Sequence, residues 1–491
     1  MQTHLKRALT LYPTTAIVVG SVVGSGIFTA PVDMARVLGS APLLLGVWVV
    51  TGVITLIGAL TQCELAAQMP RTGGLYEYFR EIYGEKTSFF YGWANFMIAG
   101  SGAIAAIAII FAKYFGEFVT LPHLSGEWEK IPWHLPYLGD IFPYANIGGK
   151  TVAGIIIIFL TIINIRGVKV GAMLQSFSTT SKVLALLIVS GVAFIAGSHI
   201  GSASNWSSVT QAGESLSGWT LVGAIGAAIT GAFWAYDGWG NVAYIGGEVK
   251  EPAKTLPRAI ILGTLIFISL YIIINLAYLY ILPIGKLATV PDDRLASEMV
   301  TAVIGGAGGA LVAGLIMLST FDTTNSSILT NARVYYAMSH DKVFSPKARE
   351  VHPKFQTPHI SLAIQGVWAL ILLFSGSFGL ILDMYVFVNW LLYVMMALGV
   401  FVLRKREPHR ERPFKVPGYP ILPAIFVLFA TSYLIVTLVK DINGYNEGTQ
   451  PIISSLTGLA LVFAGLPFYY FWKCKQKNEK TEAYETKRDD S

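Results

Sequence analysis

The chain has 491 residues, of which 54% are hydrophobic and only 13% are charged. So few charged side chains cannot cover a soluble protein of this length, so the composition indicates an integral membrane protein. The net charge of +6 arises from short basic runs rather than from one basic face, which argues against nucleic-acid binding. Only Cys63 and Cys474 are present, so neither a disulfide framework nor a Cys/His metal site is expected.

Apolar runs long enough to cross a hydrocarbon core of about 30 Å as helices recur along the whole chain. They predict an all-α integral membrane protein with twelve transmembrane helices. The predicted spans are 14–36, 43–69, 88–118, 150–166, 174–197, 219–245, 259–283, 301–336, 359–380, 381–403, 420–440 and 451–473.

The distribution of basic residues predicts the orientation of these spans. The first residues, Met1 to Arg7, lack the pattern of a cleavable signal peptide, so the first span is expected to be permanent. With this topology, 27 of the 35 Lys and Arg residues lie on the side of both termini, seven lie on the opposite side, and Lys182 lies inside a span. The positive-inside rule then places both termini in the cytoplasm of a multi-pass protein of the cell membrane.

Two glycine-containing segments interrupt the apolar pattern, Gly24-Ser25-Gly26 in the first span and residues 234–240 in the sixth. Unwound backbone in hydrocarbon is tolerated only where it is buried in protein or lines a cavity, because each unsatisfied N–H or C=O group costs several kcal/mol. Two breaks at corresponding places in two halves therefore predict a binding site near the bilayer midplane.

The two broken spans begin about 205 residues apart, which predicts a five-plus-five inverted repeat. The repeat is inverted because a set of five helices makes the next set enter from the opposite side. The predicted division is a cytoplasmic N-terminus at 1–13, a first repeat at 14–197, a second repeat at 219–403, two further helices within 420–473, and a charged tail at 474–491 that is expected to be disordered.

The first break offers groups for both charged ends of an amino acid. Gly24 and Gly26 let a ligand approach the backbone around Ser25, and the N–H groups that begin the second half-helix suit a carboxylate. The carbonyls around Val22 and Val23 are predicted to be free to accept from an ammonium group or to bind a cation. A stripe of small residues for helix packing is the alternative explanation of these glycines.

The second break adds a further pair of glycines and three aromatic side chains, which favours the binding-site interpretation. Trp234, Tyr236 and Trp239 could close over a small substrate or make a cation–π contact with its ammonium group. Other short motifs occur in order along nearly the whole chain, among them Thr72-Gly73-Gly74-Leu75-Tyr76, Asn164-Ile165-Arg166-Gly167, Gly247-Glu248, Asn389-Trp390-Leu391 and Arg412-Pro413-Phe414-Lys415-Val416-Pro417.

In this order and spacing the sequence resembles the L-type amino acid transporter family of the amino acid-polyamine-organocation superfamily, and is most similar to bacterial members such as serine/threonine exchangers. The resemblance implies a twelve-helix, five-plus-five inverted-repeat fold that works by alternating access. It also implies that the substrate's backbone is bound by Val22, Ser25 and Gly26 in the first helix and by Trp234 and Asp237 in the sixth.

The resemblance extends to the tenth helix, where Asn389 and Trp390 match a pair that faces the substrate path in some relatives. At the gating position many relatives have Phe, and this chain has Trp234. A larger ring leaves less room for a side chain, so small or medium substrates are expected.

Lys182 stands inside the fifth span, where a buried ammonium group needs a partner or a cavity, unless it snorkels to the interface. The resemblance implies that this lysine replaces a sodium ion beside the broken first helix and the hydroxyl of Thr323, so transport should not need sodium. Asp322 departs from the small residue that relatives commonly have. We expect it to pair with Lys182 or to be protonated; the alternative is that it faces a polar cavity and serves proton coupling or a cationic substrate.

The prediction is a secondary transporter, not an enzyme, that moves neutral L-amino acids, most simply as a sodium-independent exchanger without cofactor. The alternative is proton-coupled symport with Asp322 or Asp237 as the titrating carboxylate. A membrane-embedded enzyme is disfavoured because the eight His residues are scattered through loops and ends. A channel is disfavoured because the sequence shows no repeated pore-lining ring, and a signalling receptor because it shows no sizeable soluble output domain. No cysteine lies in the loop where heteromeric animal relatives attach covalently to a glycoprotein, so no disulfide-linked heavy subunit is expected.

Overall fold

The structure is a computed structural model, and it describes residues 7, 9–135, 139–166, 168–375, 378–450 and 452–475. The predicted disordered tail from residue 476 onward lies outside the described residues, as does most of the N-terminus before residue 9. Within the described residues, eleven helices are long and apolar enough to cross a membrane, and a shorter apolar helix, α16 (His359–Ser375), completes twelve spans. The predicted all-α membrane architecture is confirmed.

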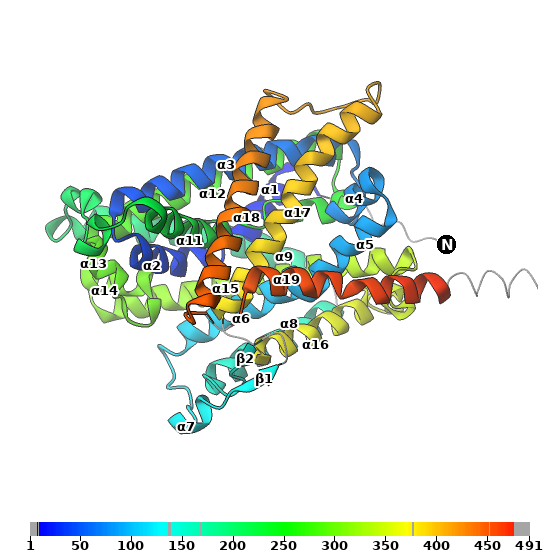
Figure 1. Ribbon diagram of the computed structural model, residues 1–491. Helices are drawn as coiled ribbons and strands as arrows, with labels where there is room; N and C mark the ends of the chain where they lie inside the picture. The colour runs from blue at the N-terminus through cyan, green and yellow to red at the C-terminus, as the bar shows by residue number, and fades with distance from the viewer. Residues whose placement is uncertain are drawn as a thin grey trace, which may run out of the picture.

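The elements of the first half are α1 (Leu11–Val22), α2 (Gly26–Leu38), α3 (Ala41–Gln68), α4 (Leu75–Tyr83), α5 (Glu85–Ala94), the π-helical turn η1 (Asn95–Ala99), α6 (Gly100–Phe115), α7 (Gly126–Glu129), β1 (Trp133–Leu135), β2 (Gly139–Ile141), α8 (Ile147–Arg166), α9 (Val168–Phe194), η2 (Ala196–His199) and η3 (Ala203–Ser207). The two strands form a short antiparallel hairpin in the loop between α6 and α8, in which Trp133 pairs with Ile141. Figure 1 shows this loop projecting from the helical body.

The elements of the second half are α10 (Gln211–Glu214), α11 (Gly218–Tyr236), η4 (Asn241–Tyr244), η5 (Gly246–Glu248), α12 (Pro252–Ile281), α13 (Ile284–Ala288), η6 (Pro291–Asp293), α14 (Leu295–Ile304), α15 (Gly306–His340), η7 (Pro346–Arg349), α16, α17 (Phe378–Arg406), α18 (Ile421–Asn446) and α19 (Ser454–Phe463). The last span continues beyond α19 to Lys475. Figure 1 places the N-terminus and the end of this span on the same side of the molecule.

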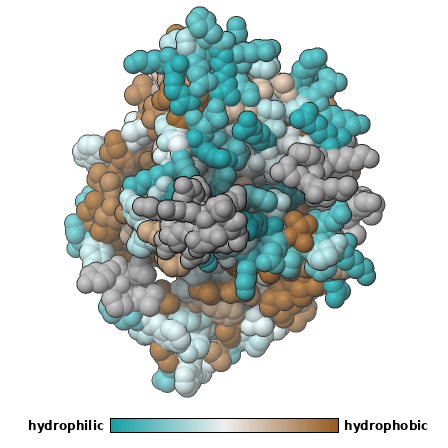
Figure 2. Space-filling model, turned by 90° about the vertical axis from the view of Figure 1, so that its right-hand side faces the viewer, coloured by the Kyte–Doolittle hydropathy of each residue, from teal (hydrophilic) through white to brown (hydrophobic). Residues whose placement is uncertain are grey.

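Burial separates central spans from peripheral ones. In the span made of α5, η1 and α6, 89% of the most apolar 18-residue stretch is buried inside the protein. In α18 and in the last span, the buried share of the corresponding stretch is only 33% and 28%. The two final helices therefore border the bundle rather than build its centre. Figure 2 shows the side that carries the termini, where hydrophilic residues gather over much of the surface and hydrophobic residues emerge toward its edges.

Several predicted spans differ from the structure at their boundaries, among them the sixth, the eighth and the ninth. The sixth, predicted over 219–245, is α-helical only to Tyr236 and continues as the short 3₁₀ turns η4 and η5. The eighth, predicted over 301–336, contains the end of α14 and begins again at Gly306, because Gly305 adopts a positive φ of 86° that ends the helix. The ninth ends at Ser375 rather than at residue 380.

The third span contains a π-helical turn that the apolar pattern does not predict. Its carbonyls serve neighbouring helices: the Tyr335 hydroxyl donates to the Asn95 carbonyl at 3.2 Å, and the Trp368 indole donates to the Met97 carbonyl at 3.0 Å. Such turns insert an extra residue into an α-helix and recur at functional sites. The turn here lies halfway along the most buried span.

An ion cluster ties together three segments on the side opposite the termini. Asp293, at the end of η6, accepts from Arg36 of α2 and, at 2.8 Å, from Lys113 of α6. Burial alone would raise the pKa of the Asp293 carboxyl, but its hydrogen bonds and charge contacts with Lys113 and Arg36 outweigh burial and hold the pKa below its ordinary value. The ionised Asp293 carboxylate therefore stabilises the contact of η6 with α2 and α6.

The lowered pKa of Asp293 fixes the direction of a pH effect on stability. A depressed pKa contributes stability above the unfolded-state pKa of about 3.9, and the contribution is lost as the pH falls through the folded-state pKa. We expect Asp293→Asn to melt at a lower temperature than the unmodified protein at pH 7, with the difference disappearing below about pH 4. Melting curves between pH 7 and pH 3 measure this, with Glu127→Gln, at an exposed position without an ion pair among the described residues, as the control.

Candidate functional site

The two breaks lie backbone to backbone at the centre of the bundle. α1 ends at Val22 and α2 begins at Gly26, while α11 ends at Tyr236. A Cβ on Gly26 would lie 2.4 Å from the Ala235 Cα atom, and one on Gly238 would lie 2.7 Å from the Ser21 carbonyl oxygen. Gly238 also has a φ of 105°, which L side chains rarely adopt. These glycines therefore allow the two unwound segments to meet, which a packing stripe within regular helices would not require.

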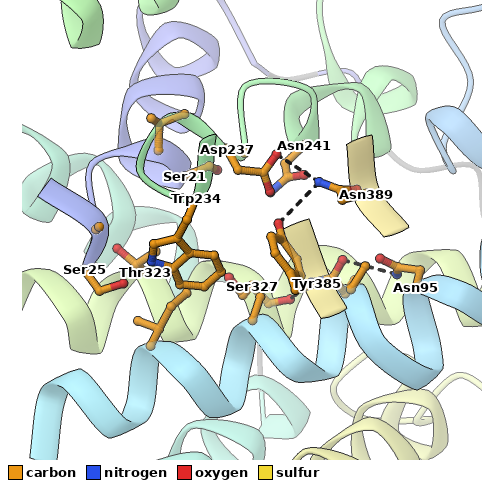
Figure 3. Close-up of a pocket in the computed structure, with 18 of the residues that line it drawn as sticks. Ser21, Ser25, Asn95, Trp234, Asp237, Asn241, Thr323, Ser327, Tyr385 and Asn389 are labelled. Atoms are coloured by element: carbon orange, nitrogen blue, oxygen red, sulfur yellow. Dashed lines mark hydrogen bonds between the residues drawn. The ribbon is translucent and has the colours of Figure 1, made fainter. Parts of the chain in front are cut away.

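A cavity of about 60 Å³ opens between the two breaks (Figure 3). Its walls come from both breaks and from η1, α6, α15 and α17. Eight of the residues predicted for the site line it: Val22, Gly24, Ser25, Gly26, Trp234, Asp237, Thr323 and Asn389. Four do not: Val23, Lys182, Asp322 and Trp390.

Trp390 is a correction to the predicted site. It is 2% exposed and stacks on Phe233 of α11 and, with ring centroids 5.6 Å apart, on Phe426 of α18. Its ring therefore packs α17 against the neighbouring helices and not against the cavity. Asn389, one residue earlier, is the member of this predicted pair that lines the cavity, whereas Trp390 lies behind the lining residue Tyr393, with ring centroids 5.8 Å apart.

The carbonyls at the end of α1 are also not as predicted, because side chains already donate to them. The Tyr271 hydroxyl of α12 donates to the Val22 carbonyl at 2.9 Å, and the Thr323 hydroxyl lies 3.4 Å from the Val23 carbonyl. Each oxygen keeps a second lone pair, but neither is without a partner. The opposite end of the break differs: α2 begins at the cavity, where the N–H groups of a first helical turn have no partner within their own helix.

Asp237 supplies the carboxylate of the cavity and is held by neutral donors. The Tyr393 hydroxyl donates to its Oδ1 atom at 2.6 Å, and the Asn389 amide donates to the same oxygen at 3.0 Å. Both donors lie on α17, one helical turn apart, and Figure 3 shows Asn389 reaching toward Asp237. Within the described residues no Lys or Arg pairs with Asp237, so its charge is available to a ligand or a proton.

Trp234 lines the cavity. Its ring meets that of Tyr385 edge to face, with centroids 5.1 Å apart and an interplanar angle of 87°. Trp234 is 7% exposed, and Figure 3 shows its ring between Ser25 and Tyr385. Aromatic edge-to-face pairs of this kind are a preferred geometry.

The wall of the cavity formed by η1 and α15 is polar, and its residues Asn95, Ser327 and Asn331 were not among the predicted site residues. The side-chain amide of Asn95, in η1, donates to the side-chain Oδ1 atom of Asn331 at 3.3 Å, and Ser327 and Asn331 lie on α15 with Thr323. A signal was present: residues 323, 327 and 331 are spaced by four, which places three polar side chains on one face of a membrane helix. Asn95 carries no comparable signal, because the π-helical turn sets its direction.

Lys182 does not line the cavity but contacts three groups beside it, one of them on the lining residue Thr323. Its Nζ atom lies 2.9 Å from Asp322 Oδ2, donates to the Thr323 hydroxyl at 2.7 Å and donates to the Gly20 carbonyl at 3.2 Å. The side chains of Lys182 and Asp322 are only 2% and 1% exposed. The predicted ion pair is therefore present, and Lys182 does not snorkel. The alternative in which Asp322 faces the polar cavity does not agree with this geometry.

These contacts join helices that are distant in sequence. The lysine of α9 reaches the C-terminal half-turn of α1 and the middle of α15, so one ammonium group links the broken helix to two intact ones. The negative end of the α1 dipole favours a cation at this place. Because the carboxylate compensates the ammonium charge, the buried cluster carries no net charge.

Twelve spans, two of them unwound around a buried polar cavity, define a secondary transporter rather than an enzyme. The sequence model of the amino acid permease family matches residues 9–462. A serine/threonine exchanger of Bacillus subtilis, SteT, is 34% identical over 473 residues, covering 96% of this chain and 97% of the relative. The chain therefore belongs to the amino acid permease family, and the predicted resemblance and its twelve-helix, five-plus-five inverted-repeat fold are confirmed.

Animal relatives are similar over the same length. A b(0,+)-type amino acid transporter 1 of Mus musculus is 27% identical over 476 residues, covering 96% of this chain and 88% of the relative. The large neutral amino acids transporter small subunit 2 of Rattus norvegicus is 29% identical over 482 residues, covering 96% and 82%. The similarity thus extends across all twelve spans rather than over one motif.

Proposed function

We propose that the protein exchanges neutral L-amino acids across the membrane by alternating access, without sodium. The observation that carries this proposal is the pairing of opposite polarities across one small cavity. The N-terminus of α2 presents amide donors around Ser25 and Gly26, and Asp237 presents a carboxylate from the second break. A zwitterion carries the complementary pair of charges, an α-carboxylate and an α-ammonium group, at the spacing of one Cα atom.

Substrate size and sodium independence rest on two further observations. Trp234 and Tyr385 leave a cavity of only about 60 Å³, which favours small side chains; serine and threonine, named for the Bacillus relative, are the first candidates. The Lys182 ammonium group occupies the space between the Gly20 carbonyl, the Thr323 hydroxyl and the Asp322 carboxylate. A sodium ion would need the same oxygen atoms as ligands, so the ammonium group occupies the position that the ion would bind.

Counterflow in proteoliposomes tests this function. A panel of labelled L-amino acids is offered to vesicles with and without unlabelled amino acid inside, in sodium and in potassium buffer. Exchange predicts uptake that requires internal amino acid and that is equal in the two buffers. Uptake into empty vesicles at the same rate, or uptake that needs sodium, would exclude the proposal.

Proton-coupled symport is the second candidate, because Asp237 lines the cavity and its hydrogen-bond donors, Tyr393 and Asn389, are neutral. The variant Asp237→Asn separates the two functions. If Asp237 carries a proton, accumulation driven by a pH gradient disappears while exchange at equal pH persists. If it binds the substrate's ammonium group, exchange itself falls at least about tenfold, the loss of one charge-assisted hydrogen bond. Tyr393→Phe, which removes only one donor, is the control and should reduce either activity less.

Three finer statements belong to the same proposal. We place both termini in the cytoplasm of the cell, following the basic loops, and keep the repeat boundaries at 14–197 and 219–403. We also propose function without a disulfide-linked subunit, since Cys63 is buried in α3 and Cys474 lies at the end of the last span. Accessibility of Cys474 to a membrane-impermeant thiol reagent in sealed cells checks the orientation: no labelling is expected unless the membrane is opened.

A further inference from the structure

A second cavity lies away from the transport site, on the side of the molecule that carries the end of the last span. It measures about 70 Å³ and forms where the end of α15, the turn η7 and the end of that span meet. Its lining includes Lys342, Arg349 and Lys475 together with the aromatic rings of Phe344 and Trp472. Its volume is roughly five times what a single buried water needs, enough for a group the size of a phosphate.

The three cations come from two segments, the connection between α15 and α16 and the end of the last span. Lys342 lies two residues after the end of α15, beyond the C-cap Asp341, and adopts the left-handed conformation, with a φ of 60°, at a position where glycine is usual. Arg349 is the last residue of η7, and Lys475 is the last described residue of the final span. Like charges gathered around one cavity repel one another, so the arrangement favours an anion between them.

Neighbouring carboxylates do not neutralise this cluster. Asp341 is engaged elsewhere, by Arg80 at 3.0 Å and by the Tyr76 hydroxyl at 2.7 Å. Glu85 pairs with Lys473 on the adjoining face of the last span. Among the residues that the structure describes, none of the three cavity cations forms an ion pair, and no carboxylate lines the cavity.

The position of the cavity along the last span indicates the source of the anion. Phe468, Tyr470 and Phe471, just before Trp472, are 49%, 52% and 60% exposed and face outward from the bundle. Exposed aromatic side chains at the end of a span mark the boundary between hydrocarbon and lipid headgroups. The cavity, which Trp472 and Lys475 line at the end of this span, is therefore expected at the depth of the lipid headgroups.

We propose that this cavity binds the phosphate of an anionic phospholipid headgroup. Arg349 can donate two parallel hydrogen bonds to a phosphate, while the lysines act as point charges. Trp472 and Phe344 cover the apolar part of the lipid next to the headgroup. Basic pockets between transmembrane helices on the side of the basic loops are suited to this class of ligand.

Titration of the purified full-length protein with short-chain phosphatidylglycerol tests the proposal, with the rise in melting temperature reporting apparent affinity. Each of Lys342→Gln, Arg349→Gln and Lys475→Gln is expected to weaken the affinity about fivefold, and the triple variant about a hundredfold. Lys347→Gln is the matched control, because it removes the same charge from the same turn at an exposed position outside the cavity. It should keep the original affinity.

Two further ligands distinguish the sources of phosphate. Phosphatidylcholine carries the same phosphate beside a fixed positive charge and should stabilise the protein much less. Inorganic phosphate lacks the apolar part and should require far higher concentrations. Equal stabilisation by phosphatidylcholine, unchanged affinity in the triple variant, or full stabilisation by inorganic phosphate alone would each overturn the assignment to an anionic lipid. Counterflow by the triple variant in neutral lipid vesicles verifies that it is folded.

Discussion

Lys182→Met is expected to abolish transport and to lower the free energy of unfolding by about 3–5 kcal/mol, because it leaves the Asp322 carboxylate buried without its counter-charge. The same change removes the donor that joins the Gly20 carbonyl of α1 to the Thr323 hydroxyl of α15. Melting temperature measures the loss of stability, and counterflow in proteoliposomes measures the loss of transport.

A double variant separates the two effects. Replacing both charges in Lys182→Met/Asp322→Leu removes the unpaired carboxylate, so the melting temperature should return most of the way to that of the unmodified protein. Transport should stay lost, since the link between α1 and α15 is still missing. Wild-type counterflow by the double variant would mean that the ion pair is structural and that Lys182 has no part in transport.

Gly26→Ala is expected to abolish transport as well, for a steric reason. The new Cβ atom would lie 2.4 Å from the Ala235 Cα atom, a backbone atom that cannot rotate away, so α2 and α11 must separate. Overpacking of a tight core costs about 1–3 kcal/mol and more when backbone must move. The distance between the two breaks sets the cavity, so the substrate's affinity should fall even where the protein still folds. Counterflow at increasing substrate concentration measures that loss.

The control for this variant is Gly223→Ala on α11, the helix whose backbone Gly26 contacts. Nothing lies within 4 Å of the Cβ atom that it would add, so its melting temperature and counterflow should match those of the unmodified protein. A Gly26→Ala variant as active as Gly223→Ala would contradict the close contact of the two breaks.

The break regions could be predicted from the sequence because their cause is local. Glycines in the middle of an apolar run mark places where backbones approach closely, and both predicted breaks lie where the chain unwinds. The form of the second break could not be predicted: η4 and η5 continue the sixth span as short 3₁₀ turns, held by contacts with distant segments such as the bridge between Thr72 and Ile245.

Side-chain direction explains the remaining differences. Adjacent helical residues point about 100° apart, so Asn389 and Trp390 need not face the same cavity, and here only Asn389 lines it. Which of them does so depends on how α17 is rotated by packing against α11 and α18, and a motif carries no information on rotation. Asn95 is a similar case, since one extra residue in the π-helical turn changes the direction of every side chain around it.

The compensated charges of Lys182 and Asp322 have a consequence for the energetics of the membrane potential. A lone ammonium group carried across the full field would exchange about 2.3 kcal/mol with the potential for every 100 mV. The pair, whose charged atoms are 2.9 Å apart, has no net charge and moves as a dipole. Its energy in the membrane potential therefore changes very little when α1, α9 and α15 change position. The helix that carries the broken site is thus linked to its neighbours by a polar cluster on which voltage exerts no net force.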